Sequence, residues 1–550
     1  MRRRVAWGAL GLAAFLLWLT GYPLLTTLVS SLREGGQWTV ASFVEFSQRP
    51  DEWLALWRSL WISAASVGLA ALVGVPLGFI FERTEFPGRR LLGGLVALPV
   101  ALPPLVGVIA FLFLYGETGF VSRAIQALLG LEESPWRLQG AGAILLVHTY
   151  SMYVYFYLFT RAGLARLDAA LMEAAASLGA GRRRTLRKVV LPLLRPALAG
   201  AALLTFMTSL ASFSAPYIFG GGFRVMTTQI TDSKLNGDLA MAQTETVVLA
   251  AVALLGLWLL QKTGSGVGVA GAVRGVAPAR RRLVSPLARV TAATAGYSLT
   301  ALLLLPHATL LLISLVPPYT WTTEAFPPVL ELSNYTGVFR EGQHLRPVLN
   351  SLWMAAAATG ASLILGFAAA RGAVRHAGTR LGKTLETLLS LPWAIPGTVF
   401  AVALATAFSV DQPLLGRFVW VGTAVILPLA YLVRCLPLTG RSALAGLRQL
   451  DPALEEAETS LGAGPVRRFT RIVFPLVRPA LVAGLGLAFI TALGDYVTSI
   501  VLYTFETRPI SIEIQSSLRV QEFGIAAAYG VLLMFLSAVA FVLWGRGEAR

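Results

Sequence analysis

Long apolar stretches alternate with short polar ones along the whole chain. Three of the clearest are VAWGALGLAAFLLWL, LWISAASVGLAALVGVPLGFIF and GIAAAYGVLLMFLSAVAFVLW. A helix needs about 20 mostly apolar residues to cross a bilayer, so the pattern predicts an all-α integral membrane protein with roughly twelve transmembrane helices. We place them near residues 5–30, 57–81, 91–115, 141–161, 193–218, 242–261, 287–316, 349–370, 385–409, 418–438, 476–502 and 525–545.

Composition agrees with this prediction. Of 550 residues, 56% are hydrophobic and 13% are charged, whereas soluble proteins carry about 25% charged residues. The single cysteine, Cys435, excludes a disulfide framework and a Cys-rich metal site. The N-terminal MRRR and the apolar run after it resemble a secretory signal, but no small-residue cleavage site follows. We therefore expect an uncleaved first helix.

The net charge of +17 raises the question of nucleic-acid binding, and its distribution argues against it. With the N-terminus in the cytoplasm, about 33 of the 45 Lys and Arg fall in cytoplasmic loops or at their helix ends, which is the positive-inside pattern of membrane proteins. We expect no nucleic-acid partner and some arginines at lipid headgroups. We therefore predict a multi-pass membrane protein with both termini in the cytoplasm.

One segment occurs twice. Residues 167–198 read LDAALMEAAASLGAGRRRTLRKVVLPLLRPAL, and residues 450–481 read LDPALEEAETSLGAGPVRRFTRIVFPLVRPAL, 283 positions later. Shorter matches, RSLW with NSLW and LPVALPP with LPWAIPG, extend the repeat. Six helices per half return the chain to the cytoplasm, so the halves form a parallel repeat. We predict one half at 1–262, a Gly-rich basic linker at 263–286 and a second half at 287–550.

Each copy has the signals of a short helix followed by a turn. An aspartate stands where a side chain caps a helix N-terminus, a glycine stands where a left-handed residue ends it, and a proline opens the next helix. These residues are Asp168, Gly179 and Pro192 in the first copy and Asp451, Gly462 and Pro475 in the second. We call residues 168–192 and 451–475 the two brackets, and expect both in the cytoplasm.

The brackets resemble the EAA signature of permease subunits of bacterial binding-protein-dependent ABC importers. The matching positions are Glu173, Ala174, Gly179 and Pro192, and then Glu456, Ala457, Gly462 and Pro475. The second copy departs from the signature at Glu458, where the family favours Ala. The resemblance implies that each bracket is a coupling helix lying in a groove of an ABC ATPase dimer. Two fused halves resemble the ferric-ion and thiamine uptake permeases.

The same resemblance implies an extracytoplasmic solute-binding protein as the second partner. It also implies that ATP and magnesium bind the partner ATPase, with no cofactor in this chain. GTRLGKT at 378–384 lacks the Walker spacing, and GVGVAG at 266–271 lies in the linker with no strand before it. The four histidines have no metal-ligand spacing. We therefore predict a transport subunit that is neither an enzyme nor a resident metal-binding protein.

Asp495 lies inside a predicted span, where a carboxylate costs about 2.5–3.5 kcal/mol and usually faces a cavity or a partner. The equivalent residue of the first half is Ser212. We predict that Asp495 and Ser212 line the translocation path, with an Asp near the outer interface as the alternative. Tyr153 belongs to a dense group of tyrosines, for which packing is favoured over contact with the path.

The strings DYVTSIVLYTFETRPISIEI and SFSAPYIFGGGF resemble ferric-ion permeases more than thiamine ones, so ferric iron is the predicted cargo. Thiamine, a polyamine, a phosphonate or another small solute remains open. An ion-coupled secondary transporter is the alternative from another class. It requires titratable groups in several spans, of which the sequence offers few besides Asp495.

Overall fold

We describe a computed structural model of the chain. It describes residues 2–101, 103–260, 281–282, 285–317, 329–409, 419–451, 453–454, 462 and 464–545. Most of the predicted linker, 263–286, and the EAA positions Glu456 and Ala457 lie outside the described residues.

The described chain is almost entirely helical. The first half contains α1 (Arg2–Ser31), α2 (Ala41–Gln48), α3 (Pro50–Arg83), α4 (Arg89–Leu95), α5 (Pro104–Tyr115), α6 (Phe120–Leu129), α7 (Gly140–Ala165), α8 (Ala169–Ser177), α9 (Arg182–Thr185), α10 (Leu191–Leu210), α11 (Ser214–Phe219), α12 (Met226–Leu235) and α13 (Leu239–Leu260). A 3₁₀ turn, η1 (Leu98–Ala101), and a π-helical turn, η2 (Leu186–Val190), interrupt this series.

The second half repeats the order. It contains α14 (Pro286–Ser314), α15 (Ser333–Arg340), α16 (Gly342–Arg375), α17 (Arg380–Ala394), α18 (Gly397–Phe408), α19 (Ile426–Arg448), α21 (Pro465–Arg468), the π-helical turn η4 (Phe469–Val473), α22 (Phe474–Leu493), α23 (Ser499–Leu502), α24 (Ile510–Arg519) and α25 (Phe523–Gly545). The strands form two ladders of two-residue strands, β1 (Arg33–Glu34) with β2 (Gln37–Trp38) and β3 (Thr84–Glu85) with β4 (Arg281–Arg282).

Several pairs of equivalent helices have equal lengths, as expected of two matching halves. α3 and α16 each have 34 residues, α10 and α22 each have 20, and α12 and α24 each have 10. The short RSLW and NSLW matches have the same structural role. The Ser59 hydroxyl accepts the first N–H of α12, and the Ser351 hydroxyl accepts the first N–H of α24, both at 2.8 Å. Each serine therefore supplies an acceptor to a helix N-terminus, where backbone donors lack partners.

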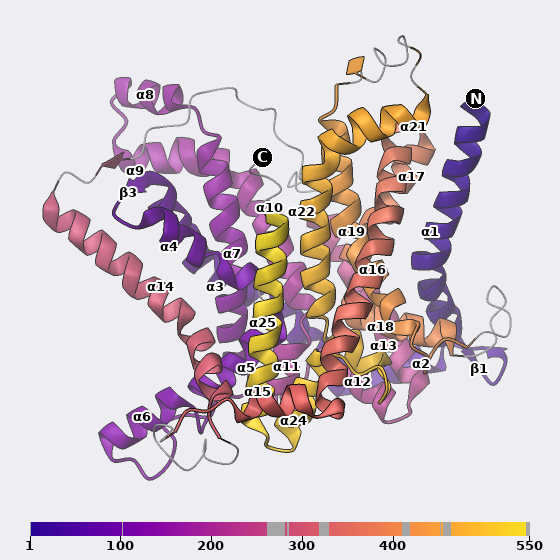
Figure 1. The fold of residues 1–550 in the computed structure, drawn as a ribbon, viewed down its shortest axis with the longest axis horizontal. Helices are drawn as coiled ribbons and strands as arrows, with labels where there is room; N and C mark the ends of the chain where they lie inside the picture. The colour runs from indigo at the N-terminus through magenta and orange to yellow at the C-terminus, as the bar shows by residue number, and fades with distance from the viewer. Residues whose placement is uncertain are drawn as a thin grey trace.

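The first helix of each half packs on the other half. α1 contacts α17 and α18 as well as α13, and α14 contacts α4 and α5 as well as α25. Figure 1 shows the two helices on opposite flanks of the bundle, α1 beside α17 and α14 beside α4. The exchange interlocks the halves, and no sequence pattern indicated it.

By length and composition, slightly fewer helices qualify as membrane spans than the roughly twelve that the sequence predicted. Ten helices of the described chain qualify, or eleven if α17 and α18 form one span bent by 107°. The predicted span 418–438 corresponds to α19, which is shifted to Ile426–Arg448 and carries Arg434, Arg441 and Arg448. These arginines make α19 too polar to qualify, although it packs inside the bundle against α16 and α22.

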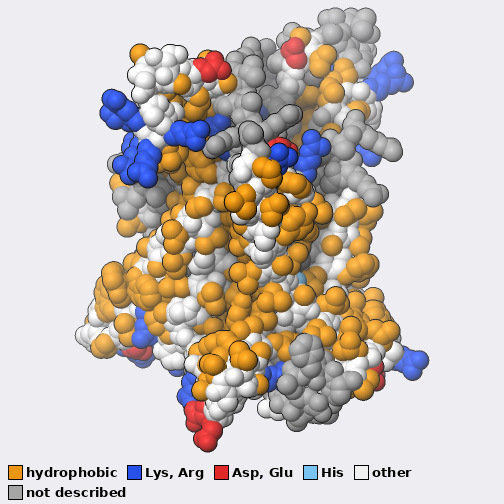
Figure 2. Space-filling model, turned by 90° about the vertical axis from the view of Figure 1, so that its left-hand side faces the viewer, with side chains coloured by type: hydrophobic (Ala, Val, Ile, Leu, Met, Phe, Trp, Pro, Cys, Tyr) orange, Lys and Arg blue, Asp and Glu red, His pale blue; other side chains and the backbone are white. Residues whose placement is uncertain are grey.

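Charge and apolar surface are separated along the long axis of the bundle. Figure 2 shows a band of hydrophobic side chains around the middle, with Lys and Arg gathered mainly at the end that carries α8. The start of α1 and the end of α25 lie toward that same end, and α12 and α24 lie toward the opposite one (Figure 1). We call these the α8 end and the α24 end.

Candidate functional site

The first bracket has the caps that the sequence predicted. The Asp168 carboxylate accepts a hydrogen bond from the Ala170 N–H at 3.0 Å and so caps α8. Gly179 is left-handed, with φ +72°. The N–H of Ala180 bonds to the carbonyl of Ala175, and that of Gly179 bonds to the carbonyl of Ala176, both at 2.9 Å. This pair of bonds is a Schellman motif, which satisfies the last carbonyls of the helix.

α8 presents most of its surface to solvent. None of its residues is buried, and Leu178 at its end is 87% exposed. Glu173 and Ala174 are both exposed. The Met172 side chain points toward the protein and packs against a small hydrophobic core that includes Leu167 and Leu194. The helix is thus attached along one side and free along the other, as a docking element would be.

Beyond the turn, the short helix α9 carries three arginines and continues through η2 into α10. Residues Arg182–Leu210 qualify together as one span of 29 residues. Within it, η2 adopts π-helical bonding directly before Pro192. Proline has no N–H to give to the carbonyl four residues earlier. We attribute the locally wider π turn to this missing bond. The result is a continuous rod from the bracket into the membrane, with one irregular turn near its base.

The second bracket has the same features where it is described. The Asp451 carboxylate accepts the Ala453 N–H at 2.9 Å, and Gly462 has φ +77°. η4 again lies directly before the proline, here Pro475. The π turn is therefore a structural feature that the two brackets share.

Asp495 is buried and paired. Its residue exposure is 5%, and its Oδ2 lies 2.8 Å from Nη1 of Arg434 on α19. Its Oδ1 accepts the Thr498 N–H at 2.8 Å and also the Thr498 hydroxyl, and Thr498 is the residue directly before the short helix α23. Asp495 thus has a charged partner on another helix, and whether it lines the path stays a prediction. Arg434 was missed, although an arginine within a predicted span is itself a signal for a partner.

The equivalent place in the first half contains no ion pair among the described residues. Ser212 lies 2.9 Å from Nε2 of His148. Nδ1 of the same ring lies 3.0 Å from the Ser66 hydroxyl and 3.1 Å from the Ser209 hydroxyl. His148 is 2% exposed and Ser66 is fully buried. We call this set the serine–histidine cluster, and Arg434 with Asp495 the ion pair.

Tyr153 has a structural role. Its ring is fully buried, and its hydroxyl donates to the carbonyl of Val96 at 2.6 Å. Val96 is the residue at which α4 ends. Tyr153 therefore satisfies a carbonyl freed where the helix breaks, in agreement with the favoured packing role.

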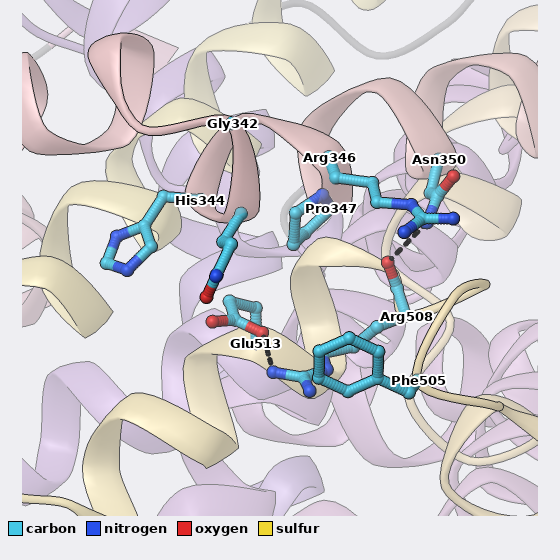
Figure 3. Close-up of a pocket in the computed structure, with 9 residues that line it drawn as sticks. Gly342, His344, Arg346, Pro347, Asn350, Phe505, Arg508 and Glu513 are labelled. Atoms are coloured by element: carbon cyan, nitrogen blue, oxygen red, sulfur yellow. Dashed lines mark hydrogen bonds and ion pairs between the residues drawn. The ribbon is translucent and has the colours of Figure 1, made fainter.

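A cavity of about 220 Å³ lies at the α24 end of the second half (Figure 3). The start of α16 and the loop before α24 line it with Gly342, Gln343, His344, Arg346, Pro347, Asn350, Phe505, Arg508 and Glu513. Arg508 pairs with Glu513 at 2.6 Å and lies over the Phe505 ring at 4.8 Å. The walls thus have charges of both signs held in fixed positions, which suits a charged group from outside. The sequence analysis gave no hint of it.

No three His, Cys, Asp or Glu side chains come together as a metal site in the part of the chain that the structure describes. The site that the repeat defines consists of two brackets, each followed by a membrane helix, and α8 of the first bracket is exposed. Two equivalent membrane halves, each with one such bracket, are the architecture of a duplicated transport subunit.

Comparison with known proteins identifies the family. The family described as "Binding-protein-dependent transport system inner membrane component" matches residues 74–261 and again residues 362–547, once in each half. The chain belongs to this family, as a fused permease with two copies of its domain.

Three relatives extend this finding. A probable ABC transporter permease protein of Sinorhizobium fredii is 30% identical over 98% of this chain and 94% of its own length. A ferric transport system permease protein of Actinobacillus pleuropneumoniae is 28% identical over 96% of this chain and 76% of its own length. A thiamine transport system permease protein of Brucella abortus is 32% identical over 46% of this chain and 46% of its own length.

Proposed function

We propose that the chain is the membrane permease of an ATP-driven importer that moves ferric iron. An extracytoplasmic binding protein delivers the cargo at the α24 end. A separate ABC ATPase dimer, which binds ATP and magnesium, docks on the two brackets at the α8 end. Both termini are then cytoplasmic, since they lie at the α8 end with the brackets (Figure 1). The permease has no catalytic residue or cofactor of its own.

The exposed bracket at the base of a continuous rod is the observation that carries this proposal. α8 is held by its two caps and by Met172, and it leads through one turn into the rod Arg182–Leu210. A push on α8 by a closing ATPase dimer therefore tilts the rod instead of being absorbed in a loop. The π turn, which has bonds of a different register, lies where such tilting would bend the rod.

The choice of ferric iron rests on the relatives. The ferric permease aligns with both halves of this chain, whereas the thiamine permease aligns with about half of it. Thiamine, a polyamine or a phosphonate remains the alternative for the same machinery.

Valine at Gly179 tests the coupling role. The positive φ of Gly179 costs an L residue about 1–2 kcal/mol, and more for a β-branched one. G179V should therefore unwind the end of α8 and lower ATP-driven uptake of radioactive ferric iron by roughly tenfold or more. Gly181 is a matched control, because its φ is −64° and a Cβ there meets nothing within 4 Å. G181V should keep uptake and the same amount of inserted protein. Full uptake in G179V combined with G462V would contradict the role.

One observation favours the alternative from another class. Glu52 and Glu245 are both fully buried, and they bind Gln229 and Ser233 at 2.9 and 2.8 Å. Buried carboxyls are what a proton-coupled secondary transporter uses. Dissipating the proton gradient while ATP is supplied separates the two: the importer continues uptake, and the secondary transporter stops.

A further inference from the structure

The two halves meet through aromatic and polar side chains toward the α24 end. Phe213 and Tyr496 occupy equivalent positions, 283 apart in the chain, and their ring centroids are 5.6 Å apart. Tyr217 stacks on Phe213 at 5.0 Å and meets Tyr496 at 6.3 Å. We call these three rings, with the polar side chains around them, the central contact.

One cation from each half reaches across this contact. Lys234 stands in the last turn of α12, and Arg519 stands in the last turn of the equivalent helix α24. Nζ of Lys234 donates to the carbonyl of Val501 in the second half at 2.8 Å. Nη2 of Arg519 donates to the hydroxyl of Tyr217 in the first half at 2.5 Å. The amide of Gln515 lies 2.9 Å from the same hydroxyl.

Both cations have neutral partners. Within the described ranges, neither Lys234 nor Arg519 forms an ion pair with a carboxylate, whereas Arg434, Arg508 and Arg161 all do. The acid four residues after Lys234, Asp238, caps the N-terminus of α13 instead. A helix C-terminus favours a nearby cation. That effect explains where these cations stand in their helices, and it does not explain why both cross to the other half without a counter-charge.

Lys234 also lies partly out of water. Its side chain is half-buried, and burial lowers its pKa from 10.5 to about 8. The direction is that of a cation desolvated without a nearby anion. A desolvated cation without a counter-charge is costly, and such a charge is often found at a ligand site.

We propose that Lys234 and Arg519 form an anion-binding mouth at the central contact, and that the cargo enters it as an anionic complex. This rests on the proposed import function and specifies its substrate: a ferric ion that still carries carboxylate or phosphate oxygens. A bare trivalent cation is repelled by both side chains. An oxyanion ligand accepts hydrogen bonds from the planar fork of Arg519 and from the ammonium of Lys234.

Anion binding to the full chain in lipid nanodiscs, without ATPase and without ATP, tests the mouth. The probes are inorganic phosphate, citrate and ferric citrate, titrated by calorimetry. R519Q and K234Q should each weaken binding about tenfold, the usual loss for one charge-assisted hydrogen bond. R519K and K234R keep the charge and should recover most of the binding. Arg340 is the matched control, since it is the cation in the last turn of α15 outside the central contact, and R340Q should bind as the wild type does.

The results distinguish phosphate from carboxylate as the ligand that supplies the oxygens. They also test the anion-binding mouth independently of the coupling role of the brackets. Binding of phosphate alone identifies phosphate oxygens, and binding of citrate and ferric citrate alone identifies carboxylates. Wild-type chain that binds none of the three, or R519Q and K234Q that bind like the wild type, would overturn the mouth. Because no ATPase is present, a failure of the bracket experiment leaves this result unaffected, and the reverse also holds.

Discussion

The two halves differ in the side chains that surround the break between a long membrane helix and the short helix after it. Each has a long membrane helix that stops and is followed by a short one, α10 by α11 and α22 by α23. Beside the first break lies the serine–histidine cluster, which has no ion pair. Beside the second lies the ion pair of Arg434 and Asp495. The brackets of the same halves share their caps, glycines and π turns.

The contrast separates two kinds of constraint. Under the proposed function, each bracket has to fit a symmetric partner, which would hold both brackets to one form. A break inside the membrane has to satisfy only its own freed backbone groups, and hydroxyls or an ion pair both achieve that. The two halves share the structure of their brackets and differ around their membrane breaks.

Removing one member of the ion pair should have the largest effect. D495A leaves Arg434 uncompensated and removes the acceptor of the Thr498 N–H, so we expect a loss of about 3–5 kcal/mol in the free energy of unfolding. S212A at the equivalent position should cost about 1 kcal/mol or less. Chemical unfolding of the chain in nanodiscs measures both, and equal losses would show that the halves do not differ here.

The conservative variant D495N tests the predicted role of Asp495 in the path. It keeps the shape of the side chain and removes the charge. If Asp495 lines the path, uptake at equal protein level should fall even where the folded fraction does not. Unchanged uptake and unchanged coupled ATP hydrolysis would leave Asp495 with the structural role alone.

The serine–histidine cluster should be of intermediate importance. H148L removes three hydrogen-bonding contacts and leaves the buried hydroxyls of Ser66 and Ser209 with each other as partners, for an expected loss of about 1–3 kcal/mol. Tyr431 is the equivalent residue of the second half, and its hydroxyl makes one contact with Ser499 at 2.6 Å. Y431F should cost about 1 kcal/mol. Thermal unfolding followed by intrinsic fluorescence ranks the two, and a larger loss in Y431F would reverse the expected order.

Replacing the whole ion pair should have the smallest effect. R434M combined with D495L removes both charges from the membrane interior, which is often neutral in buried pairs. We expect the double variant to recover all but about 1 kcal/mol of the loss seen in D495A. A double variant as unstable as D495A would show that the hydrogen bonds from Thr498 to Asp495, and not the ion pair, are the essential contacts.

The sequence predicted the local features well, because their causes are local. Asp168 and Gly179 act through the helix that begins or ends beside them. The helix ranges followed from apolar length, and the repeat gave the two halves. α19 was misplaced because its arginines blur the apolar boundary that the prediction relied on.

The missed features join residues far apart in the chain. Arg434 and Asp495 are on different helices, and the partners of His148 come from α3, α10 and the turn after α10. Hydropathy counts residues one at a time, so it registers a buried polar group without its partner. The exchange of α1 and α14 is beyond such a pattern for the same reason, since either helix is apolar enough to pack on either half.

That exchange has a consequence for how the protein is made. α1 is synthesised well before the helices α17 and α18 that it packs against, which end at Phe408. At 5–20 residues per second, roughly 20 to 75 seconds of synthesis separate α1 from these partners. Until then α1 can contact only lipid or earlier helices such as α13. Because both halves belong to one chain, the partners of α1 always follow it in the same polypeptide.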